Sequence, residues 1–288
     1  MFSIKRQLIR FRNRFYIPLI KVVSNDDCLD YIVKNRCSVV RLGDGEFDII
    51  NGKDIPYQSY NEQLSKNLEK IALMQSNKNL LVCLPDVFKD LNRYNKQTKK
   101  WYLDNFYYEN KEILAKIAFT GNWYGSTFIS RPYIDLKDKE ISNNYFKRLK
   151  NIWKDRDLLI VEGIYTRSGE GNDLFDSAKS VHRIICPAKN AYDKKDIIEE
   201  AIKKYGKNKL ILLMLGPASK VIVNDMYSKS MQLIDLGHVD SEYEWYQMGA
   251  TKKVRIPGKH TAEFNYDDDK VKLRADKAFE KQVIAYIN

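Results

Sequence analysis

Two acidic side chains, Asp44 and Glu46, follow a short run that contains Val39, Val40 and Leu42. These apolar and mostly β-branched residues are typical of a buried strand. Gly43 and Gly45 flank Asp44. Because glycine permits backbone angles that other residues avoid, we expect a tight turn there. Two carboxylates at this spacing offer the oxygen ligands that Mg2+ or Mn2+ prefers, so Asp44 and Glu46 are candidate metal ligands. A solvated acidic turn without a ligand is the alternative.

A glycine-rich loop at 162–173 carries the second group of candidate residues. Arg167 and Ser168 offer a forked cation and a hydroxyl, both of which suit phosphate. Asn172 and Asp173 could cap a helix or contact a ribose. The sequence has neither a Walker motif here nor a Gly-x-Gly-x-x-Gly after the first strand, which argues against a dinucleotide dehydrogenase. A long structural turn is the alternative.

A third group begins a predicted helix at Gly216, with Pro217 in its first turn. Free backbone amides, the Ser219 hydroxyl and the Lys220 ammonium would together bind an anion. With Arg167 and a metal, Lys220 would hold a diphosphate. An exposed lysine on a helix surface is the alternative.

A fourth group, His238, Asp240 and Glu242, lies after the predicted strand at 232–236. These side chains could hold a metal or act as the general base that takes a proton from an acceptor hydroxyl. The pattern is not His-Glu-x-x-His, which disfavours a zinc hydrolase. The Lys-His-x-x-Glu run at 259–263 is a weaker candidate of the same kind.

The elements that must position these residues alternate between strands and helices. Apolar runs predict strands at 38–42, 80–84, 158–161, 182–186, 210–215 and 232–236, and helical spacing predicts helices at 25–35, 60–75, 98–118, 138–153, 193–205, 217–228 and 268–287. The stretch 121–132 reads as irregular. This order predicts a Rossmann-like α/β fold with a mostly parallel sheet, crossover helices and a helical insertion near 86–153. The carboxyl ends of parallel strands share one edge, where we expect the polar groups to meet.

Composition limits the classes of protein that the chain can belong to. Its 288 residues are 44% hydrophobic and 30% charged, with a formal net charge of +11 that favours anionic partners. Scattered cysteines indicate a reduced, cytoplasmic protein without a zinc site. Residues 1–23 are basic and rich in aromatic side chains. They could contact the anionic inner face of the cell membrane, or they could pack on the domain. Residues 24–288 are expected to form a single domain.

Four motifs together resemble the bacterial glycosyltransferases of the GT-D fold, a family first defined as a domain of unknown function. They are Arg41-Leu-Gly-Asp-Gly-Glu-Phe, Thr166-Arg-Ser-Gly-Glu-Gly-Asn-Asp-Leu-Phe-Asp176, Leu215-Gly-Pro-Ala-Ser-Lys220 and Asp235-Leu-Gly-His-Val-Asp-Ser-Glu-Tyr-Glu-Trp245. The resemblance covers about residues 24–265, and several motifs in the same order are more specific than any one. The chain departs from the expected pattern at Glu170, where an apolar residue is usual, and at Ala218-Ser219.

The resemblance implies a nucleotide-sugar donor such as UDP-glucose, a divalent metal held through an Asp-x-Glu motif, and work on bacterial surface glycans or glycoproteins. The acceptor would be a glycan, glycolipid or glycoprotein hydroxyl, and no nucleic acid is expected. We assign donor binding to Arg41, Gly43, Asp44, Gly45, Glu46, Arg167, Ser168, Asn172, Asp173, Gly216, Pro217, Ser219 and Lys220, the metal to Asp44 and Glu46, and catalysis to Asp240, Glu242 and His238. Another metal-dependent phosphate-handling enzyme, or a non-catalytic binder of anionic surfaces, is the rival hypothesis.

Overall fold

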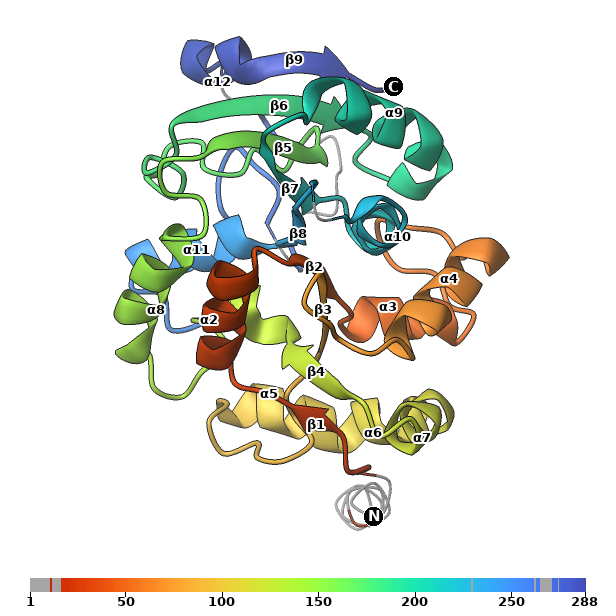
Figure 1. The fold of residues 1–288 in the computed structure, drawn as a ribbon. Helices are drawn as coiled ribbons and strands as arrows, with labels where there is room; N and C mark the ends of the chain where they lie inside the picture. The colour runs from red at the N-terminus through yellow and green to blue at the C-terminus, as the bar shows by residue number, and fades with distance from the viewer. Residues whose placement is uncertain (1–10, 12–16, 229, 262, 265–270, 274) are drawn as a thin grey trace.

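Alternating strands and helices build one parallel sheet with helices on both faces (Figure 1). The computed structural model describes residues 11, 17–228, 230–261, 263–264, 271–273 and 275–288. In these residues the strand order is β1-β4-β3-β2-β8-β7-β5-β6-β9, and every pairing is parallel. The predicted α/β class with a mostly parallel sheet is therefore confirmed.

The strands are short and their central members are buried on both sides, as expected of a parallel sheet between helical layers. Their bounds are β1 (Lys21–Val22), β2 (Ser38–Arg41), β3 (Leu80–Leu84), β4 (Trp123–Ser126), β5 (Asp157–Gly163), β6 (Ser180–Cys186), β7 (Leu210–Met214), β8 (Leu233–Asp235) and β9 (Val283–Tyr286).

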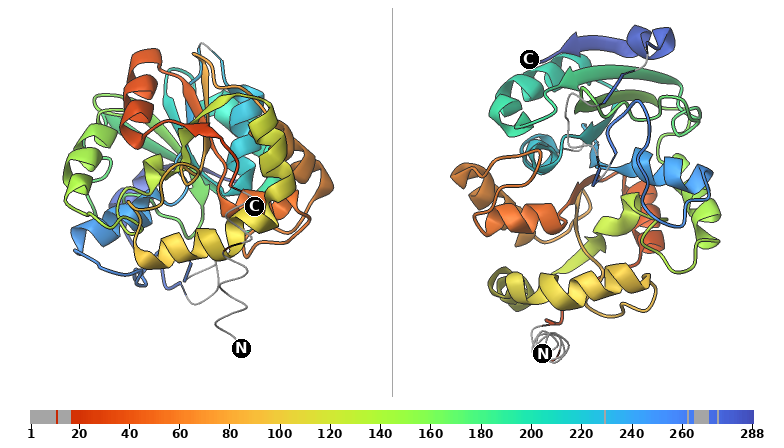
Figure 2. Two further views of the ribbon diagram at one scale, coloured as in Figure 1. Left: turned by 90° about the horizontal axis from the view of Figure 1, so that it is seen from below. Right: turned by 180° about the vertical axis from the view of Figure 1, so that it is seen from behind.

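Two hydrophobic layers lie on opposite faces of the sheet because successive side chains of a strand point to opposite sides. In β2, Val39 belongs to one layer and Val40 to the other, and in β5 Ile160 and Leu159 divide in the same way. Figure 2 shows helices on both faces. Their bounds are α2 (Asn25–Asn35), α3 (Asp44–Ile50), α4 (Glu62–Ala72), α5 (Lys96–Trp101), α6 (Tyr107–Glu109), α7 (Lys111–Phe119), α8 (Ile141–Lys150), α9 (Lys195–Tyr205), α10 (Pro217–Met226), α11 (Val239–Gln247) and α12 (Lys277–Gln282).

Three parts of the chain differ from the sequence prediction. The stretch 121–132, predicted to be irregular, contains β4, so the 86–153 region contributes a strand to the sheet and is more than a helical insertion. The helix predicted at 268–287 is confirmed only over α12, because the described residues just before it are not helical and β9 follows it and pairs with β6. Its residues 268–270 lie outside the described part of the chain.

The helix predicted at 98–118 is divided. A π-helical segment, Tyr102–Phe106, separates α5 from α6, and Asn110 separates α6 from α7. π-helical turns are rare and often occur beside functional sites. The run at 239–247, left unassigned by the sequence, is helix α11.

The amino-terminal segment is described only in part. Lys21 and Val22, which the sequence placed in the segment 1–23, form β1 and pair with Trp123 and Tyr124. Ile20 is buried. Residues 1–10 and 12–16 lie outside the described residues, so membrane contact by this segment stays a prediction. In the parts that the structure describes, no helix combines the length and the apolar character needed to cross a membrane.

Ile160 in β5 offers a test of the central sheet. Its side chain is fully buried, so Ile160→Ala should lower the free energy of unfolding by about 2–5 kcal/mol, the range for large buried aliphatic residues. Ile197→Ala on α9, where the side chain is 51% exposed, is the matched control and should have little effect. Urea denaturation compares the two variants. Equal losses would contradict the placement of β5 in the core.

Candidate active site

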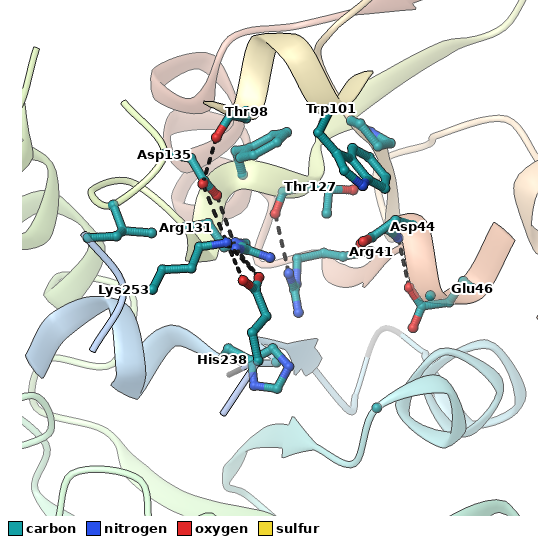
Figure 3. Close-up of a pocket in the computed structure, with 18 of the residues that line it drawn as sticks. Arg41, Asp44, Glu46, Thr98, Trp101, Thr127, Arg131, Asp135, His238 and Lys253 are labelled. Atoms are coloured by element: carbon teal, nitrogen blue, oxygen red, sulfur yellow. Dashed lines mark hydrogen bonds and ion pairs between the residues drawn. The ribbon is translucent and has the colours of Figure 1, made fainter. Parts of the chain in front are cut away.

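A cavity of about 1320 Å³ lies at the carboxyl edge of the sheet (Figure 3). Seven strands direct the chain to it, because residues at or just after their carboxyl ends line it: Arg41, Pro85, Thr127, Gly163, Pro187, Met214 and Gly237. The sequence predicted that the polar groups after the strands would share one edge, and the structure places these strand ends around one space. Open α/β sheets bind ligands at this edge, where the strand order reverses.

A buried chain of alternating charges joins β2, β8, α3 and α10 beneath the cavity. Arg41 Nε donates to the carbonyl oxygen of Asp235 at 2.8 Å, and its Nη2 lies 3.1 Å from Asp235 Oδ1. Lys220 Nζ lies 3.0 Å from Asp235 Oδ2 and 3.1 Å from Glu46 Oε1. All four side chains are buried, so each charge is compensated by a neighbour and not by water.

Arg41 makes further contacts that fix its position. Its Nη1 donates to Ser130 Oγ at 2.6 Å and to the Thr127 carbonyl oxygen at 3.3 Å. The guanidinium thus joins β2 and β8 to the segment after β4. Its donors are shared among protein acceptors, and the side chain is only 6% exposed. Arg41 therefore shapes the cavity floor.

Glycine at position 237 is required by this packing. Gly237 has φ +48°, and a Cβ there would lie 2.2 Å from Arg41 Nη2. Gly216 resembles it, with φ +53° and a built Cβ 2.7 Å from Tyr57 Cε2. Both glycines line the cavity. The backbone can approach Arg41 and Tyr57 this closely only because these positions lack side chains.

Asp44 and Glu46 occupy the first turn of α3, and the glycine turn that the sequence predicted is wrong. Gly43 is the helix N-cap in an extended conformation, and Gly45 is helical. Glu46 Oε2 accepts a hydrogen bond from the Gly43 amide at 2.7 Å, as in a capping box. Together with the Lys220 ion pair, this contact occupies both carboxylate oxygens of Glu46.

The Asp44 carboxylate, in contrast, is open to the cavity. Among the described residues, no cation forms an ion pair with it. The surrounding protein reduces the hydration of the carboxylate and so raises the pKa of Asp44, and the positive charge of Arg131 opposes that increase. Figure 3 shows Arg41 and Arg131 between Asp44 on one side and Lys253 on the other. Asp44 is thus an uncompensated acid among cations.

Arg131 leads a second group of charged residues on the cavity wall. Its Nη2 lies 3.0 Å from Asp135 Oδ2 and 3.1 Å from Glu263 Oε1. Lys253 Nζ contacts Glu263 and lies 3.7 Å from Asp135 Oδ1. Arg131 remains 20% exposed toward the cavity, so it can contact a bound anion.

Glu242 lies behind Arg131, outside the residues that line the cavity. Its Oε2 accepts hydrogen bonds from the amides of Tyr133 and Ile134, both at 3.0 Å, and its Oε1 lies 3.8 Å from Arg131 Nε. Burial raises the pKa of Glu242 to about 7, against the opposing charge of Arg131. Glu242 therefore fixes the loop that carries Arg131, and the structure does not place it where it could deprotonate an acceptor.

Asp240 has a similar structural position. Its Oδ1 accepts from the Gly169 amide at 2.8 Å and from Asn172 Nδ2 at 2.9 Å, and its Oδ2 lies 2.9 Å from Lys259 Nζ. The side chain is buried and does not line the cavity. Asp240 holds the 162–173 loop in place. Neither acid of the second Asp-x-Glu run lines the cavity, and a catalytic role for them stays a prediction.

The loop at 162–173 presents its candidate residues away from the cavity. Arg167 is bound to Glu170 and covers the Phe279 ring, and the Ser168 amide donates to Glu162 Oε2 at 2.7 Å. Asp173 contacts Lys150 Nζ at 2.7 Å, on the exposed surface. The residues of this loop that do line the cavity are Gly163 and Thr166. Arg167, Ser168, Asn172 and Asp173 do not line the cavity, and donor contacts by these residues stay a prediction.

The start of α10 also differs from the expected anion site. Ser219 Oγ accepts from the Leu215 amide at 2.9 Å, and Pro217 is buried. Lys220 Nζ also donates to the Gly216 carbonyl oxygen at 3.0 Å, which completes its three contacts. Lys220 is thus an internal counter-ion. Gly216 and Lys220 line the cavity, whereas Pro217 and Ser219 do not.

His238 does line the cavity. Its ring stacks on His260, with ring centroids 5.3 Å apart and planes 25° from parallel, and Tyr57 meets its edge. Burial, followed by the nearby His260 and the charges of Arg131, Arg41 and Lys220, lowers the pKa of His238 well below its ordinary value. The imidazole is therefore neutral at pH 7.

One of the two predicted metal ligands is available to bind a divalent metal. Asp44 fits, because its carboxylate is open to the cavity, whereas both oxygens of Glu46 are bound and one of them faces Lys220. Within the described part of the chain, no three His, Cys, Asp or Glu side chains are grouped so that they could hold a metal. Mg2+ commonly takes one or two carboxylates and completes its coordination with phosphate oxygens and water.

Sequence reasoning missed several residues that face the cavity. Arg131, Asp135 and Trp101 were not assigned, and Lys253 and Tyr57 were also overlooked. They lie in loops and helix ends with no motif, so periodicity gives no signal for them. The 259–263 run was a usable signal, because His260 and Glu263 both line the cavity.

Sequence comparison defines the class to which this fold and site belong. The model of the family described as "Glycosyltransferase GT-D fold" matches residues 39–264. Because the match covers most of the chain, the protein belongs to the glycosyltransferases of the GT-D fold.

Two curated relatives come from streptococci. The probable glycosyl transferase Gly of Streptococcus gordonii is 49% identical over 266 residues, which are 92% of this chain and 39% of the relative. Glycosyltransferase GlyD of Streptococcus pneumoniae serotype 4 is 44% identical over 271 residues, 94% of this chain and 33% of the relative. The chain thus spans well under half the length of these relatives.

Two solved structures share the fold. One is described as a new glycosyltransferase (DUF1792) from Streptococcus sanguinis; it is 48% identical, has a TM-score of 0.90 and is matched over 93% of this chain and 100% of its own. Another, a selenomethionine-substituted domain of unknown function 1792, is 49% identical with a TM-score of 0.92 over 97% of this chain and 100% of its own.

The close approach at position 237 yields a stability test. Gly237→Ala and Gly249→Ala both place a side chain at positive φ, which costs about 1–2 kcal/mol. A Cβ at Gly249 meets nothing within 4 Å, whereas one at Gly237 meets Arg41. Gly237→Ala should therefore lose about 1–3 kcal/mol more in urea denaturation. Equal losses would mean that the approach to Arg41 carries no constraint.

The buried charges yield a second test. Lys220→Met keeps the chain length but leaves Glu46 and Asp235 without a shared cation, so it should lower the free energy of unfolding by about 3–5 kcal/mol. Lys66→Met removes the exposed partner of Glu62 and should leave the free energy of unfolding nearly unchanged. Chemical denaturation measures both. A loss at Lys220 no larger than at Lys66 would show that its contacts are not needed for stability.

Proposed function

We propose that this protein transfers a sugar from a nucleoside-diphosphate sugar to a hydroxyl of a glycan or glycoprotein, with a divalent metal present. The donor is a UDP-linked hexose, and UDP-glucose is the first candidate. Membership of the GT-D family supports the reaction class. The streptococcal relatives named as glycosyltransferases support it further. We assign this reaction to the cytoplasm, where nucleotide sugars are made.

The observation that carries this proposal is the position of Asp44. It is an acid open to the cavity at the switch point between β2 and β8, with Arg131 as the opposing cation. Neighbouring acids are already paired: Glu46 with Lys220, and Asp135 and Glu263 with Arg131. A carboxylate left in this state suits a metal-bound diphosphate, and the metal would offset the charge that develops as the sugar leaves.

Arg131 is the residue best placed to contact the diphosphate. Its guanidinium is partly exposed in the cavity, and a planar guanidinium can form two parallel hydrogen bonds with phosphate oxygens. Asp135 and Glu263 fix its orientation from one side, and Glu242 holds its loop from behind. A fixed donor stabilises charge in the transition state without reorganising.

His238 is the candidate for receiving the acceptor proton. Its lowered pKa keeps the ring uncharged at pH 7 but also makes it a weak base, so the assignment rests on its position in the cavity. Stacking on His260 and contact with Tyr57 limit its rotation. Of the three catalytic residues assigned from sequence, His238 alone lines the cavity, among the residues that the structure describes.

Asp44→Asn should abolish the metal-dependent part of UDP binding. Calorimetric titration of UDP with and without Mn2+ should show metal-dependent tightening in the parent protein and none in the variant. Asp48→Asn is the control, because Asp48 also lines the cavity but is paired with Lys53. Its response to Mn2+ should match that of the parent.

Three outcomes would contradict the proposal. The reaction class fails if neither UDP, GDP nor TDP binds the parent protein with Mn2+ or Mg2+ present. The role of Asp44 fails if Asp44→Asn keeps the metal-dependent gain. If the protein hydrolyses the nucleotide sugar whatever acceptor is present, a phosphate-handling hydrolase is favoured over a transferase.

A further inference from the structure

The cavity has a second part beyond the strand ends. This outer part is lined by residues of three segments, 92–101, 131–139 and 251–253. None of them lies at the carboxyl end of a strand, since α5, the loop before α8 and the stretch after α11 supply them. The whole cavity, at about 1320 Å³, exceeds the 300–1,000 Å³ typical of a pocket for one small molecule. There is room for a second ligand.

Asp135 joins the three segments of the outer part into one structure. Thr98 Oγ1 donates to Asp135 Oδ1 at 2.9 Å, and the Asn95 backbone amide donates to the Asp135 carbonyl oxygen at 2.9 Å. Lys253 Nζ lies 3.7 Å from Asp135 Oδ1, and Arg131 lies 3.0 Å from Oδ2. The outer part is therefore held by hydrogen bonds and ion pairs around one buried acid.

Cations dominate the lining of the outer part. The acids there are Asp135 and the adjacent Glu263, and Arg131 and Lys253 form ion pairs with both. Lys96, Lys137 and Lys252, one from each segment, line the cavity with exposed side chains. Within the described residues none of these three lysines forms an ion pair. A wall of this kind attracts anions.

Trp101 provides an apolar face in the same part of the cavity. It lies on α5 with Lys96, is 39% exposed and lines the cavity. Its ring meets Tyr102 edge-on at a centroid distance of 4.9 Å and Phe106 at 6.0 Å, beside the π-helical turn. Figure 3 shows Trp101 across the cavity from His238. An immobilised indole with one open face suits the C–H surface of a sugar ring.

We propose that the outer part binds the acceptor, and that the acceptor is a saccharide carrying a phosphate or carboxylate group. The sugar ring packs on Trp101, and Lys96, Lys137 and Lys252 bind the anionic group. This inference rests on the proposed function and extends it to the acceptor. The donor takes the strand ends, where open α/β sheets bind nucleotides. The lysines therefore act on the acceptor and not on the donor diphosphate.

The test compares two triple variants with the same loss of charge. Lys96→Gln/Lys137→Gln/Lys252→Gln removes three exposed lysines of the outer part, and Lys78→Gln/Lys203→Gln/Lys207→Gln removes three exposed lysines that do not line the cavity. Calorimetry with saturating UDP and Mn2+ measures the binding of glucose, glucose 1-phosphate and glucuronic acid. The phosphate and carboxylate probes distinguish the two sources of charge.

The parent protein and the control variant should bind at least one anionic sugar about three- to tenfold more tightly than glucose, as one or two exposed charge pairs would produce. The outer-part variant should lose this difference. Trp101→Ala should weaken the binding of all three sugars. UDP affinity, measured separately, should change less than twofold in every variant.

Three results would overturn the inference. Equal binding of glucose and both anionic sugars to the parent protein would remove the role of charge. Displacement of UDP by the anionic sugars would place them at the donor site. A tenfold loss of UDP affinity in the outer-part variant would make the lysines part of donor binding. If the parent protein does not bind UDP, the proposed function is contradicted instead. The binding of the sugars is then measured without UDP.

Discussion

The compensation of four buried charges, Arg41, Asp235, Lys220 and Glu46, is the constraint on which the site depends. Each charge comes from a different element, β2, β8, α10 or α3, and a charge left alone in this environment would be strongly unfavourable. The four elements must therefore meet in one arrangement. That arrangement sets the backbone path at Gly237 and Gly43, and it leaves the Asp44 carboxylate facing the cavity while its neighbour Glu46 is engaged.

The charged residues around these four fall into two groups: some hold loops in place, and others face the cavity. Glu242 and Asp240 are buried acids that hold loops, through the amides of Tyr133 and Ile134 and through the Gly169 amide. Asp44, Arg131 and His238 are left to face the cavity. The division explains why a sequence rich in acids near strand ends offers few of them to a ligand. Most are needed to satisfy backbone amides and internal cations.

Prediction from sequence succeeded where local pattern and tertiary structure agree. The buried strands 80–84 and 210–214 are continuous apolar runs, and strand 38–41 has Val39 and Val40 at its centre. The predicted helix at 25–35 begins where the Ser24 side chain accepts a local hydrogen bond from the Asp27 amide. It failed at β4, whose Trp-Tyr-Gly-Ser sequence has no strand pattern and is held by pairing with β3. It failed again at β9, which becomes a strand only because β6 has a free edge.

The sequence by itself determined the parallel α/β class, the edge of the sheet at which polar residues gather, and the family, because these follow from periodicity and from motifs that are contiguous along the chain. The tertiary structure alone decided which polar residues face the ligand. Lys220 and Arg167 look like free phosphate-binding cations in the sequence, but Glu46, Asp235 and Glu170 neutralise them in the fold. Arg131 has no motif and still reaches the cavity. Pairing of a buried charge depends on partners up to about two hundred residues away, as Arg41 and Asp235 are, and no local pattern records them.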